Sequence, residues 1–316
     1  MSDKPWIGVS EAHRRLLGLI ERVARNDVEL LFSGETGVGK EHYARYAHRA
    51  SPRCEGPFVP VNCGSIPPDL FENELFGHVG GAFTGARARA AGLVEAAAGG
   101  TLFFDEVDAL APTNQVKLLR LLQEKEYRRL GDARPLQANA RIIAATNRDL
   151  VRAARAGQFR EDLLFRLRVV PLAVPPLRDR GDDILPLLDA FTAWYARGYN
   201  VAPVGFTPEA RAALRGYSWP GNVRELENLV RHVTCMHPGA VIEAAQLPLV
   251  GELAMAVPAG AFKRAKSTLV AEFERKYLEE ALAAADGNIA RAARSSGKPR
   301  RAFFELMRKH GVVVRR

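Results

Sequence analysis

The residues best suited to chemistry lie in a glycine-rich stretch near the start of the chain. This stretch lies between a short apolar run, Val28–Phe32, and a helical pattern, Glu41–Arg49, and it reads Gly34-Glu35-Thr36-Gly37-Val38-Gly39-Lys40. Backbone N–H groups of such a loop, at the start of a helix, can surround phosphate groups, and the lysine can reach the β- and γ-phosphate oxygens. The pattern predicts a phosphate-binding loop. Glu41 replaces the Ser or Thr that usually ligates Mg²⁺, so a plain glycine-rich turn remains the alternative.

Two further apolar runs end in polar side chains. Thr101–Phe104 leads into Asp105 and Glu106, and Ile142–Ala145 is followed closely by Asn147. Asp105 is suited to holding Mg²⁺ through water and Glu106 to polarising an attacking water molecule, while Asn147 could sense a γ-phosphate. Burying two carboxylates at a strand end costs free energy, which disfavours the alternative of an idle Asp-Glu pair at a turn. Together with the loop, these residues predict an ATPase that uses ATP and Mg²⁺, with Asp105 as the metal-binding residue.

The elements that must position these residues alternate along the first two thirds of the chain. Short apolar runs, typical of buried parallel strands, are separated by helical patterns such as Glu11–Ala24 and Gln115–Gln123. This alternation predicts an α/β fold over residues 1–173, with a parallel sheet covered by helices on both faces. Ligands of such sheets bind beyond the carboxyl ends of the strands, so we expect the loop and the acidic pair to meet there.

The pattern changes after Val174-Pro175-Pro176-Leu177 and becomes helical throughout. Residues 174–249 are therefore predicted to form a smaller, all-helical subdomain. Residues 250–265 include small side chains together with Pro258 and Gly260, which predicts a linker. Residues 266–316 are helical again and are predicted to form a third domain.

Length and composition exclude several classes of protein. The chain has 316 residues, of which 47% are hydrophobic and 26% charged, and these values are typical of folded proteins with two or three domains. No apolar run approaches the ~20 residues that span a bilayer. The N-terminus lacks the pattern of a signal peptide. The three cysteines and the scattered histidines favour neither a disulfide framework nor a zinc site. We expect a reduced, cytoplasmic protein without a membrane segment.

The net charge of +9 is concentrated at the C-terminus. Residues 252–316 carry a net charge of +7, and the last thirty residues contain nine Lys and Arg against one acidic residue. There, two short helical patterns, Gly287–Arg294 and Lys298–Phe304, flank the turn Ser295-Ser296-Gly297, as in a helix-turn-helix. This arrangement predicts a DNA-binding module, with a solvated basic tail as the alternative. The residues expected to contact DNA are Lys298, Arg300, Arg301 and Arg308.

Between the phosphate loop and the acidic pair lies a segment that is unsuited to a core helix. Its small residues surround one aromatic and predict a mobile tip that presents Phe83 and Thr84; it reads Gly81-Ala82-Phe83-Thr84-Gly85-Ala86. With this hexapeptide the chain resembles the sigma-54-dependent transcriptional activators, or bacterial enhancer-binding proteins, of the AAA+ ATPase class. The resemblance covers about residues 5–250. It includes Glu41 at the end of the loop and the segments Phe159-Arg160-Glu161-Asp162-Leu163, Pro175-Pro176-Leu177-Arg178 and Trp219-Pro220-Gly221-Asn222-Val223-Arg224-Glu225-Leu226.

The resemblance implies roles at the nucleotide that composition alone does not give. Ile7 and Gly8 would lie beside the adenine. Asn62 would restrain Glu106 as a switch between nucleotide sensing and the tip. Arg224 would be the sensor of the helical lid.

The resemblance also implies an assembly and a client. Arg160 and Arg166 would be arginine fingers that reach the γ-phosphate of a neighbouring subunit, because phosphoryl charge needs planar, permanently ionised donors. Fingers that act between subunits require a ring, and the family forms hexamers, so we expect a homo-oligomeric ring, with a paralogue in a mixed ring left open. The tip Gly81–Ala86 would contact sigma-54.

The C-terminal module resembles the Fis-type helix-turn-helix that such activators carry. Relatives usually have apolar residues around the turn, whereas this chain has Ser295, Ser296 and Lys298, which removes packing from a small domain. Because Trp6-Ile7-Gly8 begins the ATPase domain almost at the start, we expect regulation by a separate protein, such as an inhibitor, or by abundance.

The function implied is an ATP-hydrolysing activator that binds upstream enhancer DNA and remodels the closed complex of sigma-54 RNA polymerase holoenzyme to open the promoter. Two alternatives remain open at this point. One is an AAA+ remodeller with another protein client, and the other is a DNA-binding regulator that does not hydrolyse ATP.

Overall fold

The computed structural model describes residues 6–82 and 88–249 and, of the remainder, residues 278, 281, 282, 285, 288–296, 303 and 307. The chain divides into two compact units, residues 1–248 and 249–316, and each is described by itself. The predicted linker, residues 250–265, lies outside the described residues. Within the described part of the chain, no helix has both the length and the apolar character needed to cross a bilayer.

The first unit is built on a parallel sheet of five strands. The three apolar runs form its central strands, and two strands that the sequence analysis did not predict form its edges. In spatial order the strands are β2 (Phe58–Asn62), β5 (Thr101–Asp105), β8 (Arg141–Thr146), β1 (Leu30–Ser33) and β9 (Val170–Ala173). All pairings are parallel, as predicted, so the carboxyl ends of the strands meet at one edge of the sheet.

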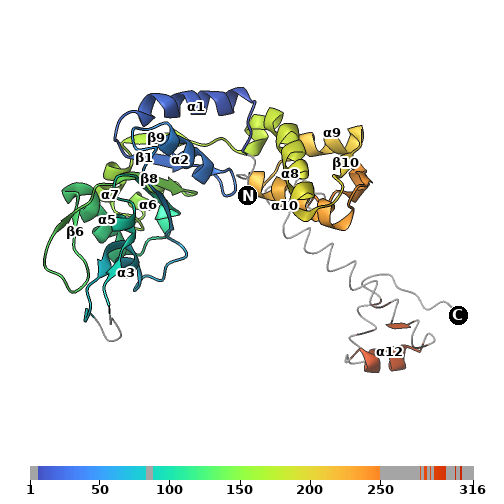
Figure 1. The fold of residues 1–316 in the computed structure, drawn as a ribbon. Helices are drawn as coiled ribbons and strands as arrows, with labels where there is room; N and C mark the ends of the chain where they lie inside the picture. Colours follow the sequence, from blue (N-terminus) through green and yellow to red (C-terminus); the bar gives the residue numbers. More distant parts are fainter. Residues whose placement is uncertain are drawn as a thin grey trace. The chain divides into compact units, whose positions relative to one another are not determined.

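Helices cover both faces of this sheet (Figure 1). Successive residues of a strand point to opposite faces, and β5 shows this directly, since Phe103 packs with α1 and α2 while Leu102 and Phe104 pack on the other side. Both faces are therefore buried, which explains why the strands read as continuous apolar runs. The helices of this part are α1 (Glu11–Ala24), α2 (Lys40–Arg49), α3 (Phe71–Phe76), α4 (Leu93–Ala96), α5 (Pro112–Glu124), α6 (Leu150–Arg155) and α7 (Glu161–Leu167), with the short 3₁₀ helix η1 (Val107–Ala109).

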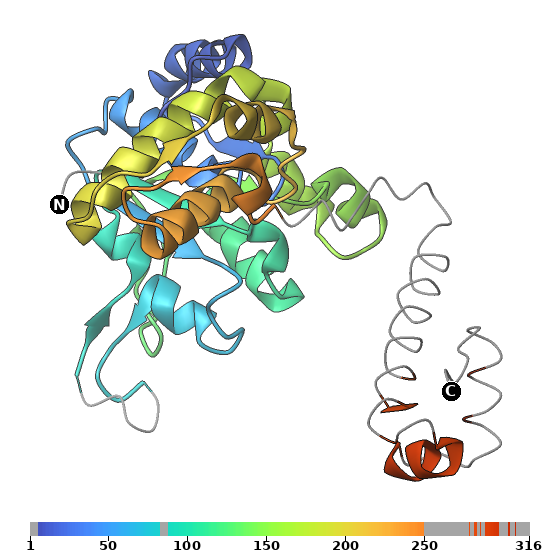
Figure 2. The same ribbon diagram turned by 90° about the vertical axis from the view of Figure 1, so that its right-hand side faces the viewer.

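Two antiparallel pairs of very short strands extend the core. β3 (Gly77–His78) pairs with β4 (Ala90–Ala91), and β6 (Glu126–Tyr127) pairs with β7 (Leu136–Gln137). Figure 2 shows β3 and β4 at the end of the core opposite α1. The loop between β6 and β7 is bonded to the segment at β3, because Leu130 donates to the backbone oxygen of Gly77 at 2.9 Å and accepts from the N–H of Val79 at 3.1 Å.

The second part of this unit is helical, as predicted, apart from one pair of two-residue strands. Its 15-residue helix α10 packs on α8 and buries Leu226, Val230 and Val233. The elements are η2 (Leu177–Asp183), α8 (Ile184–Tyr199), β10 (Gly205–Phe206), α9 (Pro208–Gly216), α10 (Asn222–Met236), β11 (Val241–Ile242) and η3 (Ala244–Gln246). We call this part the lid.

The described residues of the second unit gather around a small apolar core. Phe303 and Met307 are buried there with Leu278, Leu282 and two alanines of α12 (Ile289–Ser295). Asn288 accepts a hydrogen bond from the N–H of Arg291 at 3.2 Å, as expected of a residue at a helix start. The side chain of Ser296 contains a buried hydroxyl without a hydrogen-bond partner among the described residues, as expected where a polar residue replaces an apolar one.

One buried carboxylate ties the first segment of the chain to the lid. Asp183 accepts hydrogen bonds from the N–H groups of Val9 at 2.6 Å and Ser10 at 2.7 Å, and from the Ser10 hydroxyl at 2.9 Å. Its partner charge, the buried guanidinium of Arg180, lies 3.8 Å away and donates to the backbone oxygen of Val38 in the phosphate loop at 2.7 Å. Asp183 and Arg180 thus join the N-terminal segment, the loop and the lid.

Replacing this carboxylate should destabilise the whole first unit. We expect Asp183→Ala to lower the free energy of unfolding by about 3–5 kcal/mol, because it leaves the Arg180 charge buried and unpaired. Asp182→Ala is the matched control, since Asp182 is exposed next to it, and should stay within about 0.5 kcal/mol of the parent. Urea denaturation of the full chain, followed by tryptophan fluorescence, measures both. Equal midpoints for the two variants would contradict the role assigned to Asp183.

Candidate functional site

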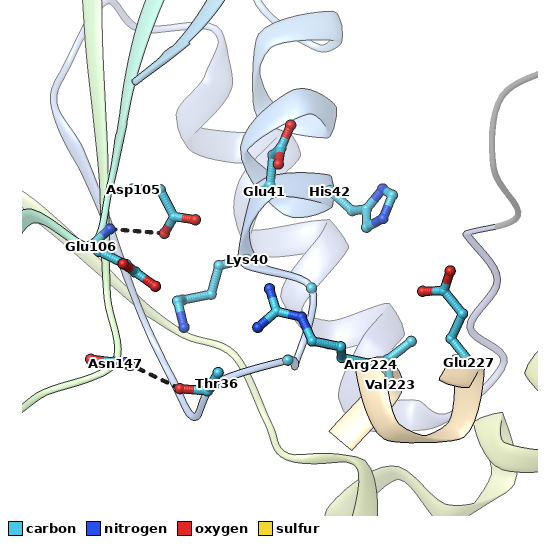
Figure 3. Close-up of a pocket in the computed structure, with 12 residues that line it drawn as sticks. Thr36, Lys40, Glu41, His42, Asp105, Glu106, Asn147, Val223, Arg224 and Glu227 are labelled. Carbon is cyan, nitrogen blue, oxygen red and sulfur yellow. Dashed lines mark hydrogen bonds between the residues drawn. The ribbon is translucent and has the colours of Figure 1, made fainter. Parts of the chain in front are cut away.

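A cleft lies at the carboxyl edge of the sheet, where the phosphate loop, the ends of β5 and β8 and the start of α10 face one another (Figure 3). Most of the residues that the sequence analysis selected for nucleotide chemistry meet here. The lining consists of Thr36, Gly37, Gly39, Lys40, Glu41, His42, Asp105, Glu106, Asn147, Val223, Arg224 and Glu227. His42, Val223 and Glu227 were not predicted as site residues, because nothing in their local sequence distinguishes a wall of the cleft from an ordinary helix surface.

The phosphate loop leads directly into α2. Gly37 and Gly39 have φ values of +80° and +95°, a left-handed backbone that glycine adopts without strain. Lys40 is the first residue of α2, is 8% exposed, and donates from Nζ to the backbone oxygens of Gly34 at 2.8 Å and Glu35 at 3.0 Å. Burial lowers the pKa of the Lys40 ammonium, and the carboxylates nearby, Asp105 first, act in the opposite direction. The ammonium is thus held inside the loop that it would leave to meet a phosphate.

The acidic pair lies at the end of β5, facing Lys40. Asp105 accepts a hydrogen bond from the backbone N–H of Glu106 at 2.9 Å. Burial raises the pKa of the Asp105 carboxyl, and this hydrogen bond and the Lys40 charge oppose that shift. Glu106 has a φ of +54°, a left-handed conformation that is strained for a residue with a side chain. Strain of this kind is concentrated at functional sites, and here it turns the Glu106 carboxylate into the cleft.

β8 ends beside the loop, as predicted. Asn147 donates from its amide to the Thr36 hydroxyl at 3.1 Å, so the third predicted strand end touches the phosphate loop directly. Asp108, which the sequence analysis did not select, accepts a hydrogen bond from Thr146 at 2.6 Å and lies 3.5 Å from Arg148. Like the charges of Asp105 and Glu106, the Asp108 charge acts to raise the Lys40 pKa, against the larger effect of burial.

The residues assigned by resemblance alone lie less directly in the cleft. Asn62 uses its side-chain oxygen to accept from the N–H groups of Gly64 at 2.9 Å and Ser65 at 3.1 Å. The Glu106 carboxylate and the Asn62 side chain both lie beside Gly64, and the switch role of Asn62 stays a prediction. Ile7 and Gly8 are not among the lining residues, and Gly8 packs so closely on the His13 ring that a Cβ there would lie 2.4 Å from it.

The three arginines selected by resemblance separate into two groups. Arg224, near the start of α10, lines the cleft and points toward Lys40 (Figure 3). Arg160 and Arg166 are exposed at either end of α7 and do not line the cleft. Arg160 forms a bidentate ion pair with Asp162, at 2.7 and 3.0 Å, which raises the Arg160 pKa.

Two sets of predicted contact residues lie mainly outside the described residues. In the tip, Gly81 and Ala82 are described and the remainder, Phe83, Thr84, Gly85 and Ala86, are not. The four basic residues expected to contact DNA, Lys298, Arg300, Arg301 and Arg308, are not described either.

The fold and the cleft together define a P-loop ATPase of the AAA+ class, with a parallel sheet, a helical lid and a C-terminal helix-turn-helix. Residues 6–173 match the Sigma-54 interaction domain, residues 178–253 match the AAA+ ATPase lid domain, and residues 269–310 match the Bacterial regulatory protein, Fis family. The chain belongs to the sigma-54-dependent transcriptional activators, as the resemblance implied.

Individual relatives support this placement. The chain is 43% identical over 298 residues to the transcriptional regulatory protein GlrR of Escherichia coli, covering 94% of this chain and 66% of GlrR. It is 52% identical over 222 residues to the sigma54-dependent transcriptional activator SfnR of Pseudomonas putida, covering 70% of this chain and 61% of SfnR. A crystal structure of NtrX from Brucella abortus in complex with ATP is similar, with a TM-score of 0.75, 35% identity, and coverage of 98% of this chain and 70% of that one. The chain thus spans just under two thirds of the length of these two curated relatives.

Different residues of the cleft should serve nucleotide binding and ATP turnover. We expect Lys40→Ala to weaken ATP binding, because it removes the cation at the phosphate loop. Glu106→Gln should bind ATP normally but lower kcat by a factor of roughly 10²–10⁴, since it removes the base and leaves the loop intact. Titration with a fluorescent ATP analogue and a phosphate-release assay measure the two effects. Turnover by Glu106→Gln at the parental rate would show that the residue is not the base.

Proposed function

We propose that this protein hydrolyses ATP and uses the cycle to remodel the closed complex of sigma-54 RNA polymerase holoenzyme so that promoter DNA melts. The observation that carries the proposal is the convergence of Lys40, Asp105, Glu106, Asn147 and Arg224 in one cleft. NtrX, which is similar over nearly the whole chain, has been crystallised with ATP. A protein that works on RNA polymerase and DNA would act in the cytoplasm.

Each group in the cleft has a distinct task in hydrolysis. The N–H groups of the loop and the α2 N-terminus would bind the phosphates, and Lys40 would exchange its two backbone acceptors for phosphate oxygens. Asp105 would hold Mg²⁺ through water, and the metal would neutralise phosphate charge. The Asp105 carboxylate suits this role because the Glu106 N–H donates to only one of its two oxygens, which leaves the other to accept from a metal-bound water. Glu106 would take a proton from the attacking water, and Asn147 and Arg224 would contact the γ-phosphate.

A ring of subunits completes this site. Arg160 and Arg166 are exposed at the two ends of α7 and do not line the cleft of their own chain, so they would serve the cleft of a neighbour, with Arg160 exchanging its Asp162 partner for a phosphate. The same surface exposes large apolar side chains, with Phe165 75% and Val169 51% accessible. Apolar groups of this size next to functional cations favour a subunit interface, and we propose a hexamer. A mixed ring with a paralogue and control by a separate inhibitor protein stay predictions.

The tip would be the tool that contacts sigma-54. The tip connects β3 to β4. The two Leu130 hydrogen bonds hold β3 and the residue after it to the loop between β6 and β7, so the tip would move together with this part of the core when the nucleotide changes. Phe83 and Thr84 would touch the client and not the nucleotide. The Fis-type module would tether the ring to upstream enhancer DNA and raise its concentration near the promoter.

The tip and the cleft should be separable by mutation. We expect Thr84→Ala to keep ATPase activity within about twofold of the parent while abolishing transcription from a sigma-54 promoter, because the substitution touches only the client contact. In vitro transcription with sigma-54 polymerase, run with ATP and with a non-hydrolysable analogue, measures the effect. Ser2→Ala, far along the chain from the tip, is the control; Thr207 would be unsuitable because its side chain caps α9. Normal transcription by Thr84→Ala would refute the contact.

The C-terminal module should read DNA through the first turn of its second helix. We expect Arg300→Ala to weaken binding to a cognate upstream site by about 1–3 kcal/mol, as loss of a base contact does. Arg315→Ala removes the same charge near the end of the chain and should weaken cognate and scrambled DNA alike. Footprinting and salt titration of the full chain distinguish these cases. Equal affinity of the parent for cognate and scrambled DNA would reduce the module to a nonspecific anchor.

A further inference from the structure

The phosphate loop carries a carboxylate that binds the lid. Glu35 accepts two hydrogen bonds from the Arg178 guanidinium, at 2.6 and 2.9 Å, and a third from the side-chain amide of Asn222 at 3.1 Å. Arg178 lies in η2 and Asn222 is the first residue of α10, so one loop residue holds the lid at two separate points. Glu35 is not among the residues that line the cleft.

Asn222 is the buried centre of this contact. Its side chain is fully buried and its amide also donates to the backbone oxygen of Thr36 at 3.1 Å, while its side-chain oxygen accepts from the N–H of Leu177 at 2.8 Å. The residue has a φ of +53°, a left-handed conformation that Asn tolerates better than most residues and that persists only where surrounding contacts hold it. One amide group thus joins the loop, the start of η2 and the start of α10.

The backbones of the loop and the lid also approach closely. The N–H of Arg224 donates to the backbone oxygen of Gly37 at 3.3 Å. A Cβ on Gly37 would lie 2.3 Å from the backbone oxygen of Gly221, closer than any side chain can come. Because no space separates the two segments, the contacts of Glu35 fix the direction from which the Arg224 side chain enters the cleft.

We propose that Glu35, Arg178 and Asn222 form a latch that docks the lid on the phosphate loop and positions Arg224 for catalysis. The inference rests on the proposed ATPase function. The three are positioning residues, because they act through Arg224 and the loop. The backbone oxygen of Glu35 holds Lys40, whereas its carboxylate holds the lid. Lys40 can therefore exchange this oxygen for a phosphate without releasing the latch.

An ordinary exposed ion pair would have little effect on either stability or activity, since such pairs contribute about 0–1 kcal/mol. The latch differs because Glu35, besides its exposed pair with Arg178, also accepts a hydrogen bond from the buried amide of Asn222. The hydrogen bonds from Arg178 and Asn222 also hold the pKa of the Glu35 carboxyl at about 2. The carboxylate is therefore ionised throughout the neutral range, and the effect of losing it should be the same at pH 6 and pH 8.

The test compares Glu35→Gln, Arg178→Ala and the double variant in the full chain. We expect each to lower kcat about tenfold, as a small displacement of a catalytic group does. Affinity for ADP should change by less than about twofold, because Lys40 and the loop glycines remain. The double variant should be no worse than either single one, since both remove the same contact. Arg53→Ala is the matched control and should have parental kcat, because Arg53 forms an equally bidentate pair with Asp27 and neither residue lines the cleft.

Hydrogen exchange tests the latch without relying on hydrolysis. Both single variants should speed exchange of the Arg224 N–H, whose acceptor is Gly37, while Arg53→Ala should leave it unchanged. Parental kcat in Arg178→Ala, additive losses in the double variant, or unchanged exchange at Arg224 would each overturn the proposal. If the parent protein hydrolyses no ATP, the proposed function fails, and the exchange result still decides whether Glu35 and Arg178 dock the lid.

Discussion

The buried ammonium of Lys40 is the constraint around which the rest of the first unit is organised. A charge that is 8% exposed must be satisfied from within, and here the loop supplies two carbonyl oxygens while β5 and η1 supply carboxylates. The parallel sheet makes this possible, because β1, β5 and β8 all end at the same edge. The order of the strands therefore determines which side chains surround the lysine, and the loop closes the remaining side.

Three separate segments converge on the loop from outside the cleft. Asp183 and Arg180 connect it to the N-terminal segment and to η2, and Asn222 connects it to α10. All three residues are buried and polar, so their hydrogen bonds hold the lid in one position relative to the sheet. The lid is thus part of the nucleotide site rather than a separate domain beside it.

The sequence was most informative where chemistry and local structure coincide. The loop, the acidic pair and Asn147 follow apolar strands, so both their type and their position could be predicted. β2 and β9 were missed because Pro60 and Pro171 interrupt them and edge strands are less apolar. The partners of Glu35 were missed for a different reason. Arg178 is 143 residues from Glu35, and Asn222 is 187 residues from it, and neither has a local pattern that indicates a distant acceptor. Contacts of that kind appear only once the chain is folded.

The left-handed backbone of Glu106 shows that this site is not built for maximal stability. At φ +54° a glutamate is strained by roughly 1–2 kcal/mol relative to a right-handed conformation, whereas glycine would be relaxed. The chain nevertheless has its proposed base at this position, directly after a strand whose first four residues are buried. A sequence selected only for thermal resistance would replace Glu106 first, so the residue marks a point where activity and durability are in direct opposition.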